Sequence, residues 1–199
     1  MNSDDKRNVD IYEALLAEHG ETYRALDWGS RESQQKRFEV LAGIGISAGD
    51  RVLDVGCGLA DLNAWLIEHR PGVEYSGIDL TPVMAERAQA RFPNAKISNQ
   101  TIFDLDFPIQ AFDYLVASGI FVFRQKSPEE YLFSTIRTMY KFCIKGVAFN
   151  SLSFWAEIKS PNEFYADPAT VINFCRRLTR KVVLRHDYHP ADFTVYMYK

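Results

Sequence analysis

The segment from residue 52 to residue 60, VLDVGCGLA, constrains the fold of this chain more than any other. An apolar strand pattern ends at Val55, Gly56 and Gly58 follow at once, and an apolar helical pattern begins at Leu59. Glycine lets the backbone turn tightly and approach a ligand closely, and the free N–H groups of a helix start attract an anionic group such as a carboxylate. The segment therefore predicts a strand, a glycine turn and a helix that meet a nucleotide-like ligand.

Strand and helix patterns alternate from residue 51 onward, which implies a parallel sheet with helices on both faces. The last two strands are separated only by the turn His186 to Asp192, so they must be antiparallel. We expect an α/β fold with a seven-stranded mixed sheet, in which six strands are parallel and the last strand is antiparallel. The expected strands are 51–55, 73–79, 95–102, 112–117, 146–150, 181–185 and 193–198, and the expected core helices are 59–69, 82–92, 128–142 and 168–178.

Residues 1–50 lack the alternation of strand and helix patterns. They show two helical patterns at 9–19 and 33–41 with a polar loop between them. The loop, residues 23–30, carries two large aromatic side chains that could lie over a ligand or cap the fold. A length of 199 residues is typical of one α/β domain. We therefore expect a single domain, residues 1–199, made of an N-terminal helical cap (1–50) and a core (51–199).

Composition narrows the partners. The formal net charge is −3 and no basic stripe is present, so a nucleic-acid partner is not expected. The first ten residues are polar, and the longest apolar stretch, 112–123, is too short for a membrane helix. Three widely spaced cysteines predict neither a disulfide framework nor a metal site, and they suit a reducing cytoplasm. A small molecule is the expected partner of a cytoplasmic monomer or homodimer.

Two acidic residues decide between nucleotide-like ligands. A dinucleotide-binding glycine motif requires a small residue at position 61, where Asp61 would repel a pyrophosphate. Asp79 closes the second strand, where its two oxygens could accept hydrogen bonds from two ribose hydroxyls. An NAD-dependent oxidoreductase is therefore disfavoured.

The pattern Asp-x-Gly-x-Gly-x-small resembles motif I of the class I S-adenosylmethionine-dependent methyltransferases, with Ala60 in place of the commoner third glycine. The resemblance covers residues 51–199 and implies a Rossmann-like fold, S-adenosyl-L-methionine as cofactor and methyl transfer. It assigns cofactor binding to residues around the first two strand ends: Asp54, Gly56, Cys57, Gly58, Asp79 and Leu80.

The family pattern implies two further sets of cofactor-binding residues, one for the adenine and one for the methionine part. The adenine set falls on Thr101 and Ile102, while the nearest acid, Asp104, comes three residues late. Backbone around Ala117 and Ser118, at the end of the fourth strand, would line the methionine half. The chain lacks the Asn/Asp-Pro-Pro-Tyr and Pro-Cys signatures, so exocyclic or amide nitrogen and cytosine carbon are not expected acceptors.

The N-terminal segment resembles small bacterial methyltransferases that read Trp-x-Ser-x-x-x-Gln-x-x-Arg-Phe, here Trp28, Ser30, Gln34, Arg37 and Phe38. We count the first four of these among the cofactor-binding candidates. Gln34 and Arg37 share one helix face. They could reach the methionine carboxylate or a substrate, or they could form a solvated face with Phe38 in the core.

Ligands of such sheets bind at the carboxyl ends of the strands, so the turn after residue 185 should face the active site. His186, Tyr188 and His189 are therefore the catalytic candidates, with histidine as a possible general base, although they could merely order the hairpin. Asn150, Phe121 and Trp155 are the substrate-binding candidates. The sequence predicts methyl transfer to a small-molecule oxygen nucleophile. The alternative is a cofactor-binding regulator or scaffold without turnover.

Overall fold

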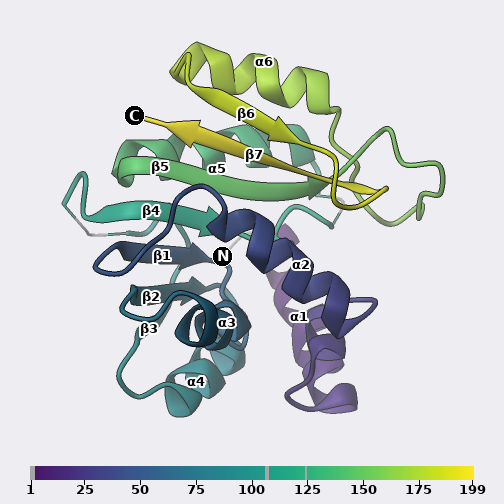
Figure 1. The fold of residues 1–199 in the computed structure, drawn as a ribbon. Helices are drawn as coiled ribbons and strands as arrows, with labels where there is room; N and C mark the ends of the chain where they lie inside the picture. The colour runs from purple at the N-terminus through teal and green to yellow at the C-terminus, as the bar shows by residue number, and fades with distance from the viewer. Residues whose placement is uncertain (1–2, 106–107, 124) are drawn as a thin grey trace.

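The structure of the chain, a computed structural model, describes residues 3–105, 108–123 and 125–199. Its sheet has seven strands in the order β3-β2-β1-β4-β5-β7-β6 (Figure 1). Strands β1 to β5 pair in parallel, and β7 is antiparallel to both β5 and β6, so the predicted mixed sheet is confirmed. The strands are β1 (Arg51–Val55), β2 (Glu74–Asp79), β3 (Lys96–Asn99), β4 (Phe112–Ala117), β5 (Cys143–Leu152), β6 (Val182–Arg185) and β7 (Asp192–Tyr198).

Helices cover both faces of this sheet (Figure 1). Helices α5 and α6 pack on one face, and α2 and α3 pack on the other. Alternate residues of a strand point to opposite faces, so Leu53 of β1 joins the core beneath α5 while Val52 joins the core beneath α3. The helices are α1 (Ser3–His19), α2 (Arg31–Ala42), α3 (Asp61–His69), α4 (Pro82–Arg91), α5 (Pro128–Phe142) and α6 (Pro168–Leu178), with a short 3₁₀ helix, η1 (Tyr23–Leu26).

Two strands differ in length from their sequence predictions by more than one residue. Strand β5 extends from Cys143 to Leu152 because it pairs with β4 on one side and, as far as Leu152, with β7 on the other. Strand β3 is an edge strand that pairs only with β2, over four residue pairs, and it is therefore shorter than predicted. The aromatic connection after β5 is held by two isolated bridges, Phe123 with Glu163 and Ser153 with Ala166.

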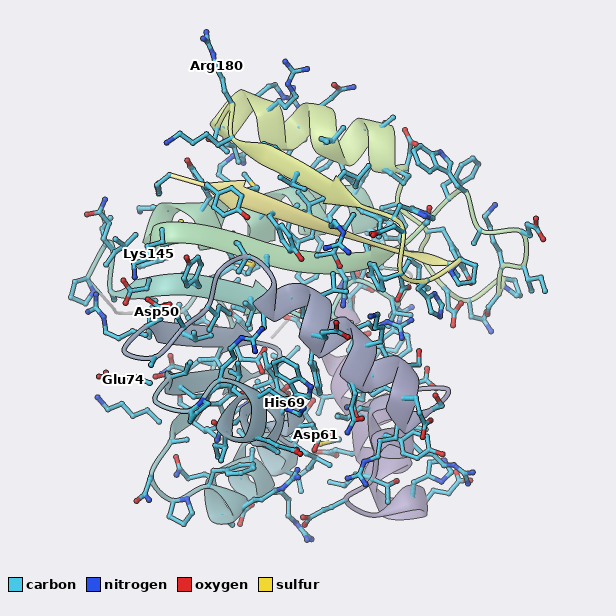
Figure 2. All side chains as sticks on the ribbon, viewed as in Figure 1. Asp50, Asp61, His69, Glu74, Lys145 and Arg180 are labelled. Atoms are coloured by element: carbon cyan, nitrogen blue, oxygen red, sulfur yellow. The ribbon has the colours of Figure 1, made fainter. Side chains whose placement is uncertain are left out.

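The amino ends and the carboxyl ends of the parallel strands differ in their surroundings. At the amino ends of the parallel strands, Lys145 forms ion pairs with Asp50 and Asp113, and Figure 2 shows Asp50 and Lys145 together at the left of the molecule. Arg180, beyond the end of α6, extends into solvent. The strand order reverses between β1 and β4, and such a switch point opens a crevice at the carboxyl ends of the strands.

The cores contain the three cysteines, which are buried and unpaired. No helix in the described part of the chain is both long and apolar enough to span a membrane.

Candidate functional site

The glycine turn after β1 has the backbone geometry that its sequence predicts. Gly56 and Gly58 have positive φ angles of 73° and 52°. A Cβ atom would lie 2.2 Å from Ile120 if it were added to Gly56, and 2.6 Å from Leu26 if it were added to Gly58. The backbone N–H of Gly56 also donates to the carbonyl of Ile78 in β2, at 2.8 Å. Both conformation and space therefore favour glycine at these two positions.

Asp79 stands at the carboxyl end of β2 and fixes the turn from the side. Its Oδ2 accepts a hydrogen bond from the N–H of Gly58 at 2.7 Å, and its Oδ1 accepts one from the N–H of Thr81 at 2.8 Å. Burial raises the pKa of Asp79, while these two bonds oppose the rise. A carboxylate oxygen has more than one acceptor site, so each oxygen can still accept a hydroxyl group.

Asp54 is the second buried carboxylate of the turn. It accepts a hydrogen bond from the hydroxyl of Tyr75 at 2.8 Å. Burial raises the pKa of Asp54 to about 7; the Tyr75 bond opposes this rise and the nearby charge of Asp79 adds to it. A cation bound beside Asp54 would stabilise the ionised form.

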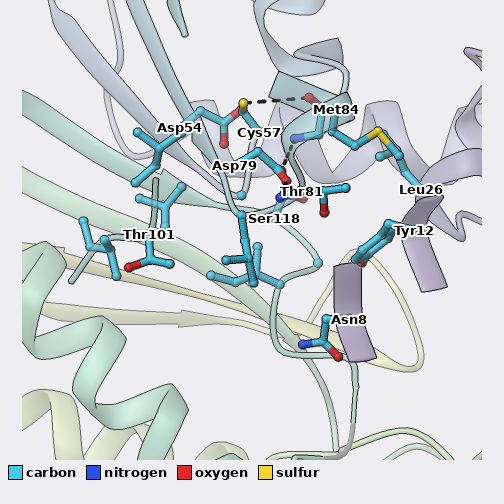
Figure 3. A pocket seen from close by; sticks show the side chains of 18 of the residues that line it. Asn8, Tyr12, Leu26, Asp54, Cys57, Asp79, Thr81, Met84, Thr101 and Ser118 are labelled. Atoms are coloured by element: carbon cyan, nitrogen blue, oxygen red, sulfur yellow. Dashed lines mark hydrogen bonds between the residues drawn. The ribbon is translucent and has the colours of Figure 1, made fainter. Parts of the chain in front are cut away.

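A cavity of about 570 Å³ opens above these residues, and Figure 3 shows side chains that line it. The predicted residues in its wall include Cys57, Leu80 and Ser118 besides those of the turn. Its charged lining is one-sided, because no lysine or arginine occurs among the described residues that line it. The acidic side chains are those of Asp5, Asp54, Asp61, Asp79 and Asp104.

This lining tests which cofactor fits. A pyrophosphate would meet several carboxylates and no described cation, which is unfavourable. The sulfonium and ammonium groups of S-adenosyl-L-methionine are cations that this lining favours. The residues present therefore fit S-adenosyl-L-methionine better than a dinucleotide.

Asp61, at the start of α3, also ties the N-terminal segment to the turn. Its Oδ2 accepts a hydrogen bond from Nε2 of Gln34 at 3.1 Å, and its Oδ1 pairs with Nη1 of Arg91 at 2.6 Å. Gln34 is 4% exposed and lines the larger cavity. Gln34 therefore lies at the predicted site, where its hydrogen-bond partner is Asp61, the residue that disfavours a pyrophosphate.

The wall formed by α1 was missed by the sequence analysis. Asp5, Asn8 and Tyr12 of this helix line the larger cavity, and Figure 3 shows Asn8 and Tyr12 on their helix at its edge. Burial raises the pKa of Tyr12, and the charge of Asp79 adds to the rise. Tyr12 falls within the predicted helix 9–19, whereas Asp5 and Asn8 precede its predicted start.

The predicted adenine set lies in the same cavity. Thr101 and Ile102 both line it, and so does Asp104. The hydroxyl of Thr101 donates to Oδ2 of Asp104 at 2.6 Å. The acid that comes three residues late in the sequence therefore joins the predicted threonine in space.

A smaller cavity of about 120 Å³ shares lining residues with the larger one. Leu26, Trp28 and Gly119 line both cavities. A Cβ added to Gly119, whose φ is 77°, would lie 3.1 Å from the Trp28 ring, so this ring lies against the backbone after β4. The other lining residues are Asp27, Gly29, Ser33, Arg37, Phe121, Val122, Asn150, Ser151, Leu152, Glu163 and Asp192.

Two predicted substrate residues, Asn150 and Phe121, line this smaller cavity. Asn150, in β5, accepts a hydrogen bond from the N–H of Gly119 at 2.8 Å and donates one to Oγ of Ser118 at 3.1 Å. It therefore fixes the loop after β4, where the two cavities meet.

Arg37 of α2 is buried at the smaller cavity, with 6% of its surface exposed. Its Nε pairs with Asp192, its Nη1 donates to the carbonyl of Ser33 at 2.9 Å, and its guanidinium lies 4.8 Å from the Trp28 ring centre. A solvated helix face is therefore wrong for both Gln34 and Arg37. The two side chains line different cavities.

Three of the predicted cofactor-binding and substrate-binding residues line neither cavity. Ser30 caps α2, where its Oγ accepts a hydrogen bond from the N–H of Ser33 at 3.1 Å. Ala117 is fully buried at the end of β4. Trp155 is 54% exposed on the connection after β5.

The predicted catalytic residues of the hairpin also lie outside both cavities. His186 Nε2 is 2.8 Å from Oγ of Ser153, and the hydroxyl of Tyr188 is 2.8 Å from Oγ1 of Thr194. His189 accepts a hydrogen bond through Nδ1 from a backbone N–H of the same hairpin, and burial lowers its pKa. In this structure the three side chains contact residues of the hairpin and Ser153 of the connection after β5, and none of them lines either cavity.

Comparison with known proteins agrees with this geometry. Residues 52–141 match a family model described as a methyltransferase domain. A Mycobacterium tuberculosis protein with a provisional methyltransferase name is 31% identical over 153 residues, which cover 73% of this chain and 91% of that protein. Erythromycin 3''-O-methyltransferase of Saccharopolyspora erythraea is 35% identical over 92 residues, 43% of this chain and 30% of that enzyme.

The fold is also that of a solved methyltransferase. Magnesium protoporphyrin IX methyltransferase from Synechocystis PCC 6803, solved with bound S-adenosylmethionine, superposes with a TM-score of 0.71. The match covers 99% of this chain and 98% of that one at 13% sequence identity. Motif, cavity lining, sheet order and relatives agree, and this chain belongs to the class I S-adenosylmethionine-dependent methyltransferase family.

Proposed function

We propose that the chain binds S-adenosyl-L-methionine in the larger cavity and transfers its methyl group to a small-molecule oxygen nucleophile in the smaller cavity. The observation that carries this proposal is the shared wall of the two cavities, made by Leu26, Trp28 and Gly119. Because both cavities reach the loop after β4, a donor and an acceptor bound in them would meet there.

The cofactor side of the proposal rests on the first two strand ends. Asp79 would accept the ribose hydroxyls, Thr101 and Ile102 would hold the adenine, and Ser118 would contact the methionine half. The carboxylate of Asp54, in the floor of the larger cavity, would stabilise a positively charged group of the cofactor. When bound, S-adenosyl-L-methionine supplies an electrophilic methyl group on its sulfonium.

The chain's own contribution is mainly alignment, since displacement at a sulfonium has a good leaving group. The loop after β4 is fixed by Asn150, and the Trp28 ring covers Gly119 at the meeting point. These rigid contacts would orient the two reactants and exclude water. A named relative acts on an oxygen of erythromycin, which supports an oxygen acceptor.

The test is an extract screen. Purified protein is incubated with isotopically labelled S-adenosyl-L-methionine and a low-molecular-weight cell extract, and products are identified by mass spectrometry. We expect a labelled small-molecule product. Tight cofactor binding in calorimetry without any labelled product would favour the alternative of a regulator or scaffold, and label on nitrogen or carbon would overturn the oxygen assignment.

A cytoplasmic location and a monomeric or homodimeric state complete the proposal. The three buried, unpaired cysteines are compatible with a reducing compartment. Sedimentation of the purified protein measures the oligomeric state directly.

A further inference from the structure

The charges around the smaller cavity bear on the kind of acceptor that fits. Arg37 is the only lysine or arginine among the described lining residues, and two of its three guanidinium nitrogens are already engaged. Nε pairs with Asp192, Nη1 donates to Ser33, and the Trp28 ring lies over the guanidinium. A bidentate grip on an acceptor carboxylate needs two free parallel N–H groups, which this arrangement does not offer.

Three carboxylates stand in the same lining, on Asp27, Glu163 and Asp192. Asp192 is neutralised by Arg37, and Glu163 accepts a hydrogen bond from the hydroxyl of Tyr165. An acceptor carboxylate would therefore meet like charges, whereas a hydroxyl group could donate a hydrogen bond to one of them.

Asp27 is the carboxylate best placed to receive a hydroxyl proton. It directly precedes Trp28, whose ring lies where the two cavities meet. Its φ of 58° is left-handed, which is uncommon for a residue other than glycine, and its N–H donates to the carbonyl of Arg24 at 3.0 Å. None of the described residues donates a hydrogen bond to its side chain, so its oxygens are available.

The surroundings of Asp27 also raise its pKa, which is the direction that favours uptake of a hydroxyl proton. Burial and the charge of Glu163 raise its pKa, while His19 of α1 opposes the rise. In turn, the charge of Asp27 contributes to the raised pKa of Tyr12 in the wall of the larger cavity. Asp27 is thus electrostatically linked to both cavities.

We propose, on the basis of the function proposed above, that the smaller cavity takes a hydroxyl-bearing acceptor without a carboxylate, and that Asp27 is the general base for its hydroxyl. In the transfer, a bond forms between the acceptor oxygen and the methyl carbon as the bond from that carbon to sulfur breaks. Sulfur keeps the electron pair of the broken bond. The hydroxyl proton moves to a carboxylate oxygen of Asp27.

The acceptor class is tested by separating the low-molecular-weight extract on an anion exchanger into acidic and non-acidic pools before labelling. We expect an alkali-stable labelled ether in the non-acidic pool. An alkali-labile methyl ester from the acidic pool, or a labelled amine, would overturn the inference while leaving methyl transfer intact. No label in either pool would overturn both this inference and the proposed function.

The role of Asp27 is tested with Asp27→Asn, because asparagine also tolerates the left-handed backbone. With the unlabelled non-acidic pool and labelled S-adenosyl-L-methionine as substrates, we expect the rate of methyl transfer to fall about 100-fold or more, with little change in calorimetric affinity for S-adenosyl-L-methionine. The rate of the unaltered protein should rise with pH as Asp27 ionises, and the variant should lose this acidic limb. If Asp27→Asn keeps both the rate of methyl transfer and the acidic limb of the pH–rate profile, Asp27 is not the general base.

Two controls separate chemistry from structure. Asp10→Asn changes an exposed aspartate of α1 that pairs with Lys6, and it should leave rate and pH profile unchanged. A carboxyl NMR titration of the unliganded protein gives a readout that does not depend on turnover. The signal absent from Asp27→Asn should titrate above the ordinary aspartate range, and a titration within that range would contradict the role.

Discussion

Arg37 of α2 and Asp192 of β7 form an ion pair in which the two side chains are only 7% and 3% exposed. The pair joins the N-terminal segment to the last strand of the sheet, and the Trp28 ring lies over its guanidinium. Taking two charges out of water is costly, so such a pair is maintained only by good geometry and further hydrogen bonds. It holds the wall of the smaller cavity to the sheet.

Removing one member of this pair should strongly destabilise the fold. We expect Arg37→Leu to lower the free energy of unfolding by about 3–5 kcal/mol, because Asp192 is left buried without its cation. Urea unfolding measures the change. The double variant Arg37→Leu with Asp192→Leu should recover much of the loss.

The exposed pair of Lys36 and Glu39 on the same helix provides a matched control. Lys36→Ala should cost no more than about 1 kcal/mol, since exposed pairs are screened by water. A similarly small cost for Arg37→Leu would contradict a stabilising role for the buried pair.

Asp79 should be essential for cofactor affinity. Its two oxygens hold the N–H groups of Gly58 and Thr81, so Asp79→Ala removes the expected ribose acceptor and loosens the glycine turn. We expect affinity for S-adenosyl-L-methionine in calorimetry to fall at least tenfold, because a hydrogen bond to a charged group contributes about 1.5–3 kcal/mol. Unchanged affinity would reject this placement of the ribose.

Most of the sheet was predictable because strand and helix have different hydrophobic periods. The helix Pro128–Phe142 was predicted with its observed bounds, and the final hairpin followed from a turn too short for a crossover. The residues at the ends of β1 and β2 could also be predicted, since neighbouring parallel strands end at the same edge.

The walls contributed by the N-terminal segment were less predictable. The position of Tyr12 over the larger cavity and the pairing of Arg37 with Asp192 depend on how distant elements pack. Local periodicity carries no information about such partners. The same reasoning explains why the hairpin histidines line neither cavity. They follow the carboxyl end of β6, as the rule for ligand sites requires. However, β6 is the last strand in the strand order and is far from the switch point between β1 and β4.

Asp54 should make the stability of the unliganded protein depend on pH. Its folded pKa of about 7 lies above the ordinary value of about 3.9, so between these values the folded state binds more protons than the unfolded state. The free energy of unfolding should therefore decrease as pH rises from about 4 to 7.

Asp54→Asn imitates the protonated form and can still accept the Tyr75 hydrogen bond. We expect the variant to be more stable than the unaltered protein at pH 8 and about equally stable at pH 4, in urea unfolding without ligand. The difference at pH 8 should be on the order of a few kcal/mol. Equal stability of the two proteins at pH 8 would show that Asp54 is not destabilised by burial.

Gly119 should control the position of Trp28 and hence the meeting point of the cavities. Its φ is 77°, and an added Cβ would lie 3.1 Å from the Trp28 ring, so Gly119→Ala must both strain the backbone and displace the ring. Gly49 is a matched control, because its φ is 84° and an added Cβ would meet nothing within 4 Å. Each substitution should destabilise the fold by about 1–2 kcal/mol from backbone strain.

Only Gly119→Ala should change the reaction. Displacing Trp28 moves the shared wall, so we expect kcat with the acceptor identified in the extract screen to fall about tenfold or more, as small misplacements of reacting groups are costly. Gly49→Ala should retain the kcat of the unaltered protein. Thermal unfolding and initial rates measured on the same preparations separate the two effects, and equal rates for both variants would show that the Trp28 ring does not set the alignment.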